Sequence, residues 1–126
     1  MQKVRTPAQK RPEQIRDEYL RLIDRHLEDL VHGGAEDMFE IEDLASQLFI
    51  HPTHLSNTIK AVTGESACGV YQLRIVAVAE RLLADPKRSV RDVALMLTFE
   101  PSQFSKWFKR FNGQTPRAYR RGLSLP

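Results

Sequence analysis

Two short segments of the sequence carry polar side chains, at helical spacing, that suit hydrogen bonding to the edges of DNA bases. Asparagine and glutamine can pair bidentately with adenine, lysine can reach O6 and N7 of guanine, and a threonine methyl group can contact that of thymine. None of the side chains concerned is acidic. The candidate DNA-binding residues are Thr53, His54, Ser56, Asn57 and Lys60 in the first segment, and Ser102, Gln103, Ser105, Lys106, Lys109 and Arg110 in the second.

Both segments belong to an internal repeat. Ile41–Gly64 aligns without a gap with Val90–Gly113, a shift of 49 positions. Identical pairs include Asp43/Asp92, Ala45/Ala94, Leu48/Leu97, Pro52/Pro101, Ser56/Ser105, Lys60/Lys109 and Gly64/Gly113. Each copy has the size and pattern of a helix, a tight turn and a second helix, which is the helix-turn-helix unit of many DNA-binding proteins.

The second helix of each copy has one apolar face that would pack inside the domain. In the first copy this stripe is Leu55, Ile59 and Val62. In the second copy it is Phe104, Phe108 and Phe111, with Trp107 at its edge. On a helical wheel the candidate DNA-binding residues fall on the opposite side, so each second helix is predicted to be a recognition helix. Lys60, Lys109 and Arg110 lie further along, where a helix leaving the groove meets phosphates.

The whole chain reads as an all-α fold of about seven helices, with two helix-turn-helix subdomains joined by a linker helix. No alternating apolar and polar run indicates a strand. The expected organisation is a disordered basic tail at 1–12, a leading helix plus the first helix-turn-helix at 13–64, a linker helix at 65–85 and the second helix-turn-helix at 86–126.

Several residues mark where these helices begin and end. Gly64 and Gly113 are well placed to terminate the recognition helices. Ser89 and Asp92 have the spacing of a capping box at the start of the second copy. His51 is expected to cap the first recognition helix.

Composition limits the remaining possibilities. The chain has 126 residues, enough for one domain or two small lobes, and a single cysteine, which excludes an internal disulfide and favours the cytoplasm. Residues 1–50 carry seven Lys and Arg against eleven Asp and Glu, a net −4, whereas residues 51–126 carry twelve against five, a net +7. The basic part suggests a polyanionic partner. Neither a secretory signal nor an apolar run of spanning length is present, so no membrane partner is expected.

Other chemistries find little support. His51 and His54 have a spacing seen among metal ligands, but no second pair accompanies them, so no metal site is expected. Phosphate-binding loops, nucleophile elbows and metal-binding helix motifs are absent, so neither an enzyme nor a cofactor is expected. Cys68 lacks a second cysteine to resolve an oxidised form, and a packing role is expected for it.

The sequence resembles the DNA-binding domain of AraC/XylS-family transcription regulators. The stretches that carry the resemblance are IEDLASQL at 41–48, HPTHLSNTIKAVTG at 51–64, AERLLAD at 79–85, SVRDVALMLTF at 89–99 and FSKWFKRFNGQTPRAYR at 104–120. It implies a bacterial cytoplasmic activator or repressor that lays both recognition helices into successive major grooves. Carried over by position, the base-reading candidates are Thr53, Ser56 and Asn57, then Ser102, Gln103, Ser105 and Lys106.

Two departures bear on that resemblance. The family usually has glycine in each turn, where this chain has Phe49 and Thr98. If these sites need a positive φ, a residue with a side chain costs about 1 kcal/mol or more, so altered turns are expected. The segment between Phe99 and Phe104 is also one residue shorter than the usual pattern, which affects the register of the second recognition helix.

A second class of function stays open. The chain could be a helical interaction module that docks on RNA polymerase or another regulator and binds DNA weakly. As this chain, a monomer is expected, because one polypeptide already carries two recognition helices. It is expected to be either a stand-alone regulator or the C-terminal piece of a longer protein.

Overall fold

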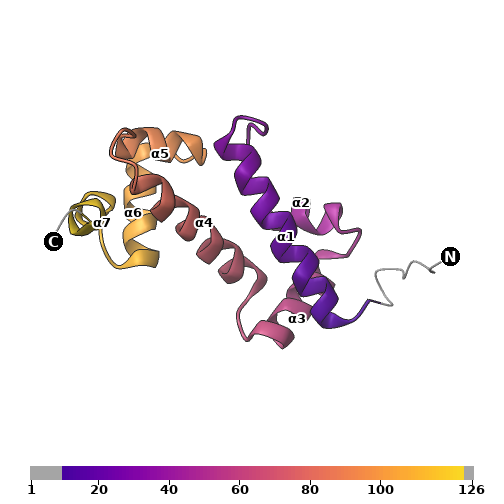
Figure 1. The fold of residues 1–126 in the computed structure, drawn as a ribbon. Coiled ribbons are helices and arrows are strands. Elements are labelled where there is room, and N and C mark those ends of the chain that lie inside the picture. Colours follow the sequence, from indigo (N-terminus) through magenta and orange to yellow (C-terminus); the bar gives the residue numbers. More distant parts are fainter. Residues whose placement is uncertain (1–9, 124–126) are drawn as a thin grey trace. The chain divides into compact units, whose positions relative to one another are not determined.

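The computed structural model describes residues 10–123, and these residues form seven α-helices and no strand (Figure 1). The all-α prediction is therefore confirmed. Residues 1–9 of the predicted tail lie outside the described residues, and the first helix already begins at Pro12. The helices are α1 (Pro12–Val31), α2 (Ile41–Gln47), α3 (Pro52–Thr63), α4 (Ala67–Leu83), α5 (Val90–Met96), α6 (Pro101–Asn112) and α7 (Pro116–Leu123).

The helices divide between two compact units. Unit 1 consists of the chain up to His26 together with Phe39–Tyr71, and it contains α2 and α3. Unit 2 consists of Leu27–Met38 together with the chain from Gln72 onward, and it contains α5, α6 and α7. Helices α1 and α4 each contribute to both units, so segment 65–85, expected as a separate linker, supplies residues to each.

The ends of the helices follow the local chemistry of the sequence. Ser89 and Asp92 form the predicted capping box. The Ser89 hydroxyl accepts a hydrogen bond from the Asp92 N–H at 2.9 Å, and the Asp92 carboxylate accepts one from the Ser89 N–H at 3.0 Å. Ser66 caps α4 by accepting from the N–H of Gly69 at 2.9 Å, and Thr115 caps α7 by accepting from that of Ala118 at 3.1 Å. Each bond satisfies an amide that has no partner inside its helix.

The core of unit 1 lies where α1 packs against the first helix-turn-helix. Its buried side chains include Ile15, Tyr19, Ile23, Leu44, Ala45, Leu55 and Ile59. The Tyr19 hydroxyl donates to the backbone oxygen of Ala67 at 2.6 Å. Burial raises the pKa of Tyr19, so its phenol stays protonated and remains a donor.

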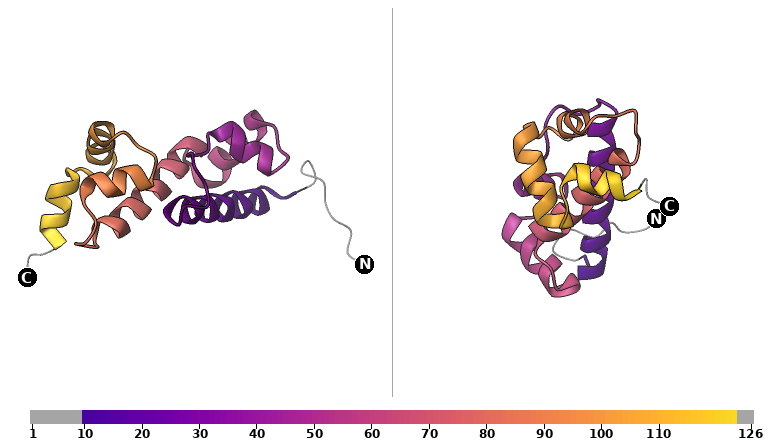
Figure 2. Two further views of the ribbon diagram at one scale, coloured as in Figure 1. Left: turned by 90° about the horizontal axis from the view of Figure 1, so that it is seen from above. Right: turned by 90° about the vertical axis from the view of Figure 1, so that its left-hand side faces the viewer.

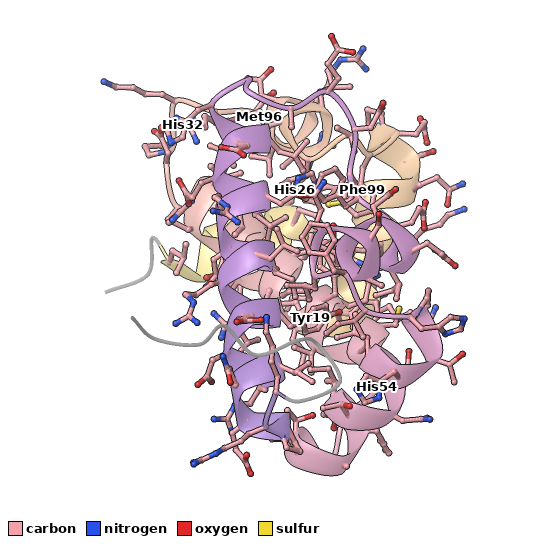
Figure 3. All side chains as sticks on the ribbon, turned by 90° about the vertical axis from the view of Figure 1, so that its right-hand side faces the viewer. Tyr19, His26, His32, His54, Met96 and Phe99 are labelled. Atoms are coloured by element: carbon pink, nitrogen blue, oxygen red, sulfur yellow. The ribbon has the colours of Figure 1, made fainter. Side chains whose placement is uncertain are left out.

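A buried histidine fixes the chain just before α2. His26 stacks on Phe39 with ring centroids 3.8 Å apart, and its Nε2 accepts a hydrogen bond from the Phe39 N–H at 2.9 Å. Figure 3 shows Tyr19 and His26 along α1. Because Nε2 is the acceptor, the neutral ring carries its proton on Nδ1. Tyr71 restrains the same residue, because its hydroxyl donates a hydrogen bond to the Phe39 backbone oxygen at 2.9 Å.

In unit 2, α6 contacts both α5 and α7 (Figure 2), and the core of the unit is rich in aromatic side chains. Phe104 and Phe108 are fully buried, as predicted, and Phe108 meets Tyr119 edge-on with centroids 5.6 Å apart. Phe111, predicted to complete the stripe, is only partly buried. Trp107 is also partly buried, and its Nε1 donates to Gln72 Oε1 of α4 at 2.5 Å.

Arg120 ties α7 to the rest of unit 2. Its Nε donates to the backbone oxygen of Leu83 at 2.9 Å, and its Nη2 donates to that of Arg88 at 2.5 Å. A longer contact of 3.4 Å reaches the oxygen of Asp85. One guanidinium group therefore satisfies carbonyl oxygens at the end of α4 and in the loop that leads to α5.

Replacing Arg120 by methionine is expected to lower the free energy of unfolding by about 2–3 kcal/mol, because hydrogen bonds to a charged group are lost and carbonyl oxygens are left without a partner. Urea unfolding followed by circular dichroism measures this. Arg121→Met is the control, because Arg121 is exposed and surface changes stay within about 0.5 kcal/mol. Equal losses in the two variants would contradict the structural role of Arg120.

Candidate nucleic-acid interface

Each unit presents a helix-turn-helix whose turn contains a residue with positive φ. The turn between α2 and α3 has Phe49 at φ 57°, and the turn between α5 and α6 has Thr98 at φ 63°. Both residues thus adopt the left-handed conformation despite its cost to a residue with a side chain. The expectation of altered turns is therefore wrong, because each turn has the positive φ that glycine favours. The turns are set by backbone bonds, from the Ile50 N–H to the Ala45 oxygen at 3.0 Å and from the Phe99 N–H to the Ala94 oxygen at 2.8 Å.

The two recognition helices begin and end in equivalent ways. Pro52 and Pro101 each stand in the first turn, and Gly64 and Gly113 end the helices at φ 82° and 93°. His51 caps α3, because its Nδ1 accepts from the Thr53 N–H at 3.1 Å. The capping role expected for His51 is therefore confirmed.

Helix α3 separates its buried and exposed faces as the sequence predicts, except that Val62, expected to complete the buried stripe, is only partly buried. Leu55 and Ile59 are 0% exposed. The candidate residues Thr53, His54, Asn57 and Lys60 are exposed, and Ser56 is half-buried. Lys60 Nζ donates to the Gly64 oxygen at 2.8 Å, which places its charge at the C-terminal end of the helix.

Helix α6 shows the same division. Phe104 and Phe108 face the core, whereas the candidates on the other side are exposed, except for half-buried Ser105: Ser102, Gln103, Ser105, Lys106, Lys109 and Arg110. The Arg110 guanidinium lies 5.4 Å from the centre of the Phe111 ring. This face therefore offers an amide, hydroxyls and cations in one exposed strip.

A carboxylate that the sequence analysis did not assign to the site begins α6. Glu100 caps the helix and accepts hydrogen bonds from the Ser102 hydroxyl and from the Gln103 N–H, the latter at 3.1 Å. The hydrogen bond from Ser102 is the main reason why the pKa of Glu100 lies below its usual range. The Ser102 hydroxyl is therefore committed as a donor to Glu100. The sequence contained one signal for this capping role: Glu100 occupies the same position in the second repeat as His51, the cap of α3, occupies in the first.

Basic residues that the sequence analysis also passed over lie beside α6. Arg91 and Arg117 line a hollow of about 460 Å³ together with Ser102 and Ser105. An adjoining hollow of about 710 Å³ adds Arg121 to these two arginines. We call Arg91, Arg117 and Arg121 the arginine cluster. The excess of positive charge in residues 51–126 was the signal that could have indicated it.

A metal site, a membrane contact and a role for Cys68 were also considered from the sequence. Among residues 10–123, no group of three or more His, Cys, Asp or Glu is placed to hold a metal ion. Over the same range, no helix is both long and apolar enough to cross a membrane. The packing role expected for Cys68 is wrong, because its side chain is exposed on the first turn of α4.

Comparison with known proteins gives one family and several relatives. A family model described as a helix-turn-helix domain matches residues 44–122. The Right origin-binding protein of Escherichia coli K12 is 35% identical over 96 residues, which are 72% of this chain and 32% of that protein. The uncharacterized HTH-type transcriptional regulator YobQ of Bacillus subtilis is 30% identical over 95 residues, 74% of this chain and 39% of that protein. The chain thus spans well under half the length of these curated relatives.

Solved structures share the fold. The AraC-type DNA-binding domain-containing transcriptional regulator from Chromobacterium violaceum has a TM-score of 0.74 at 19% identity, over 90% of this chain and 96% of that one. The DNA-binding domain of AdpA, a global transcriptional factor solved with a target DNA, has a TM-score of 0.68 at 25% identity, over 83% and 91% of the two chains.

Proposed function

Because the chain belongs to the AraC-type helix-turn-helix family of DNA-binding transcription regulators, we propose that it binds two half-sites on duplex DNA as a monomer, with α3 and α6 each in a major groove. The observation that carries the proposal is the repetition of one exposed polar helix face in both units. A cytoplasmic setting, where the chain would meet DNA, is part of this proposal.

The exposed residues divide by the contacts that they can make. The amides of Asn57 and Gln103 suit adenine, and Thr53 and Lys106 offer a methyl group and a cation for other bases. Hydroxyls at Ser56, Ser102 and Ser105 complete the base-reading set, with His54 at its flank. Glu100 restricts Ser102 to a role as acceptor towards DNA, because its hydroxyl proton is already donated.

The cations around the base-reading residues are the groups suited to contact phosphates. Lys60, Lys109 and Arg110 lie near the C-terminal ends of the recognition helices. In unit 2 the arginine cluster adds charge next to the half-buried hydroxyl of Ser105. Cations at such positions orient a protein on the duplex and carry little sequence information.

A footprint tests the two-site proposal. Selection from a random duplex library should give a bipartite sequence whose halves lie about 10–10.5 bp apart, the separation of successive major grooves on one side of the duplex. Hydroxyl-radical footprinting at protein concentrations where sedimentation shows a monomer should protect both halves. Protection of a single half, or binding that requires a dimer, would contradict the proposal.

Lys109→Ala and Arg117→Ala are each expected to weaken all duplexes alike and to lower the slope of log K against log salt by about 1 unit, because each removes one phosphate contact. Arg88→Ala is the matched control, since Arg88 is paired with Asp85 at 3.5 Å. Fluorescence anisotropy on selected and random duplexes at several salt concentrations measures the slopes. A change in base preference with an unaltered slope would show that these cations read bases instead.

A further inference from the structure

One aromatic side chain departs from the burial pattern of unit 1. Phe49, in the turn between α2 and α3, is 84% exposed and has a φ of 57°. A left-handed backbone costs a residue with a side chain roughly 1–2 kcal/mol, and a ring exposed to water gains little from burial. The stability of the fold therefore gives no reason for phenylalanine at this position, where glycine would be favoured.

Phe49 borders a hollow on the surface of unit 1. This hollow of about 540 Å³ lies between α1 and the end of α2. Leu22, Leu48 and Phe49 give it an apolar lining, and none of the residues that line it belongs to α3. An apolar side chain from another molecule could enter here without covering the proposed base-reading residues.

Positive charge lines the α1 side of the hollow. Lys10 is paired with Glu18 at 2.7 Å, but within residues 10–123 no ion-pair partner accompanies Arg21 or Arg25. These two arginines are exposed and stand four residues apart on α1, so they are neighbours on one helix face. Each guanidinium group can bind a carboxylate through two parallel hydrogen bonds.

We propose that Arg21, Arg25, Leu48 and Phe49 form a docking surface, here called the Phe49 surface, for an acidic segment of a partner protein. The carboxylates of the segment bind the two arginines, and an apolar side chain between them enters the hollow beside Phe49. Charge complementarity and the exposed ring together favour this occupant. A DNA duplex would satisfy the arginines with phosphates, but its stacked bases offer no apolar side chain for the hollow.

The probe for the experiment is a short fluorescein-labelled peptide in which Asp and Glu residues flank a central Leu-Phe pair. A second peptide replaces that pair by two serines, and a random-sequence DNA duplex is the third probe. The protein variants are Phe49→Gly, which suits the positive φ and keeps the turn, and Arg25→Ser. Arg11→Ser is the matched control, because Arg11 is exposed and does not line the hollow.

Anisotropy titrations of the full chain are expected to show weak binding of the Leu-Phe peptide, as befits a small contact area. Phe49→Gly and Arg25→Ser should each raise its Kd by about tenfold, which corresponds to 1.4 kcal/mol, whereas Arg11→Ser should leave it unchanged. The serine peptide should bind at least tenfold more weakly than the Leu-Phe peptide. DNA affinity should be the same for Phe49→Gly and the parent chain.

Three results would overturn the proposal. The Leu-Phe peptide could show no binding up to millimolar concentration. The serine peptide could bind as well as the Leu-Phe peptide, which would reduce the contact to general electrostatic attraction. Finally, Phe49→Gly and Arg25→Ser could weaken DNA binding as much as peptide binding, which would assign the surface to nucleic acid.

Discussion

Replacement of Phe108 by alanine is expected to unfold unit 2 under conditions in which the parent chain is folded. Phe108 is 0% exposed and contacts Phe104 and Tyr119, with ring centroids 5.9 and 5.6 Å away. Truncating a buried phenylalanine costs about 3–5 kcal/mol, and a whole domain is stable by only about 5–15 kcal/mol. The loss is therefore a large fraction of the stability that a domain has.

The chain offers a direct readout of this effect. Trp107 is the single tryptophan, and its ring lies in tilted contact with those of Phe99, Phe104 and Phe111 in unit 2. Urea unfolding followed by Trp107 fluorescence should shift strongly to lower urea in Phe108→Ala. Phe111→Ala, at a partly exposed ring, is the control and should shift less. Equal shifts for the two variants would contradict the assignment of Phe108 to the core.

Asn57→Asp is expected to weaken binding to the selected duplex by about 2–4 kcal/mol, roughly 30- to 1,000-fold. The change keeps the shape of the side chain but removes the amide donor. It also places a negative charge where the proposed interface meets acceptor-rich base edges and phosphates. Anisotropy titration with the selected duplex measures the loss.

Two further variants separate the causes of that loss. Asn57→Ala removes the hydrogen bonds without adding charge and should cost about 1–3 kcal/mol, at one base position only. Gln14→Glu makes the same change in net charge on the exposed side of α1 and should have little effect. If Gln14→Glu weakened binding as much as Asn57→Asp, net charge would explain the loss and α3 would not be the reading helix.

The fold of each unit could be predicted because its signals are local and occur twice. The glycines that end α3 and α6, the prolines in their first turns and the capping box at Ser89 are chemistry within a few residues of the helix ends. The inward faces of α3 and α6 followed from helical periodicity, and Leu55, Ile59, Phe104 and Phe108 are all fully buried. The candidate DNA-binding residues are exposed or half-buried for the same reason.

Residues joined across long stretches of sequence could not be predicted in this way. Arg120 reads as one basic residue among several, and only the folded chain brings the Leu83 and Arg88 carbonyl oxygens to it. Periodicity placed Phe111 in the buried stripe, but it cannot show that the core ends before that ring. The exposure of Cys68 could not be predicted either, because it depends on which face of α4 is covered by other parts of the fold.

The sequence by itself determined that this protein is all-α, that it carries two helix-turn-helix motifs, and which polar faces those motifs expose. These properties depend on spacing along one helix, where neighbours in space are three or four residues apart. Only the tertiary structure decided that the arginine cluster flanks α6 and that Phe49 borders a basic hollow. Each of these contacts depends on how a turn or a neighbouring helix is oriented, and helical periodicity does not contain that information.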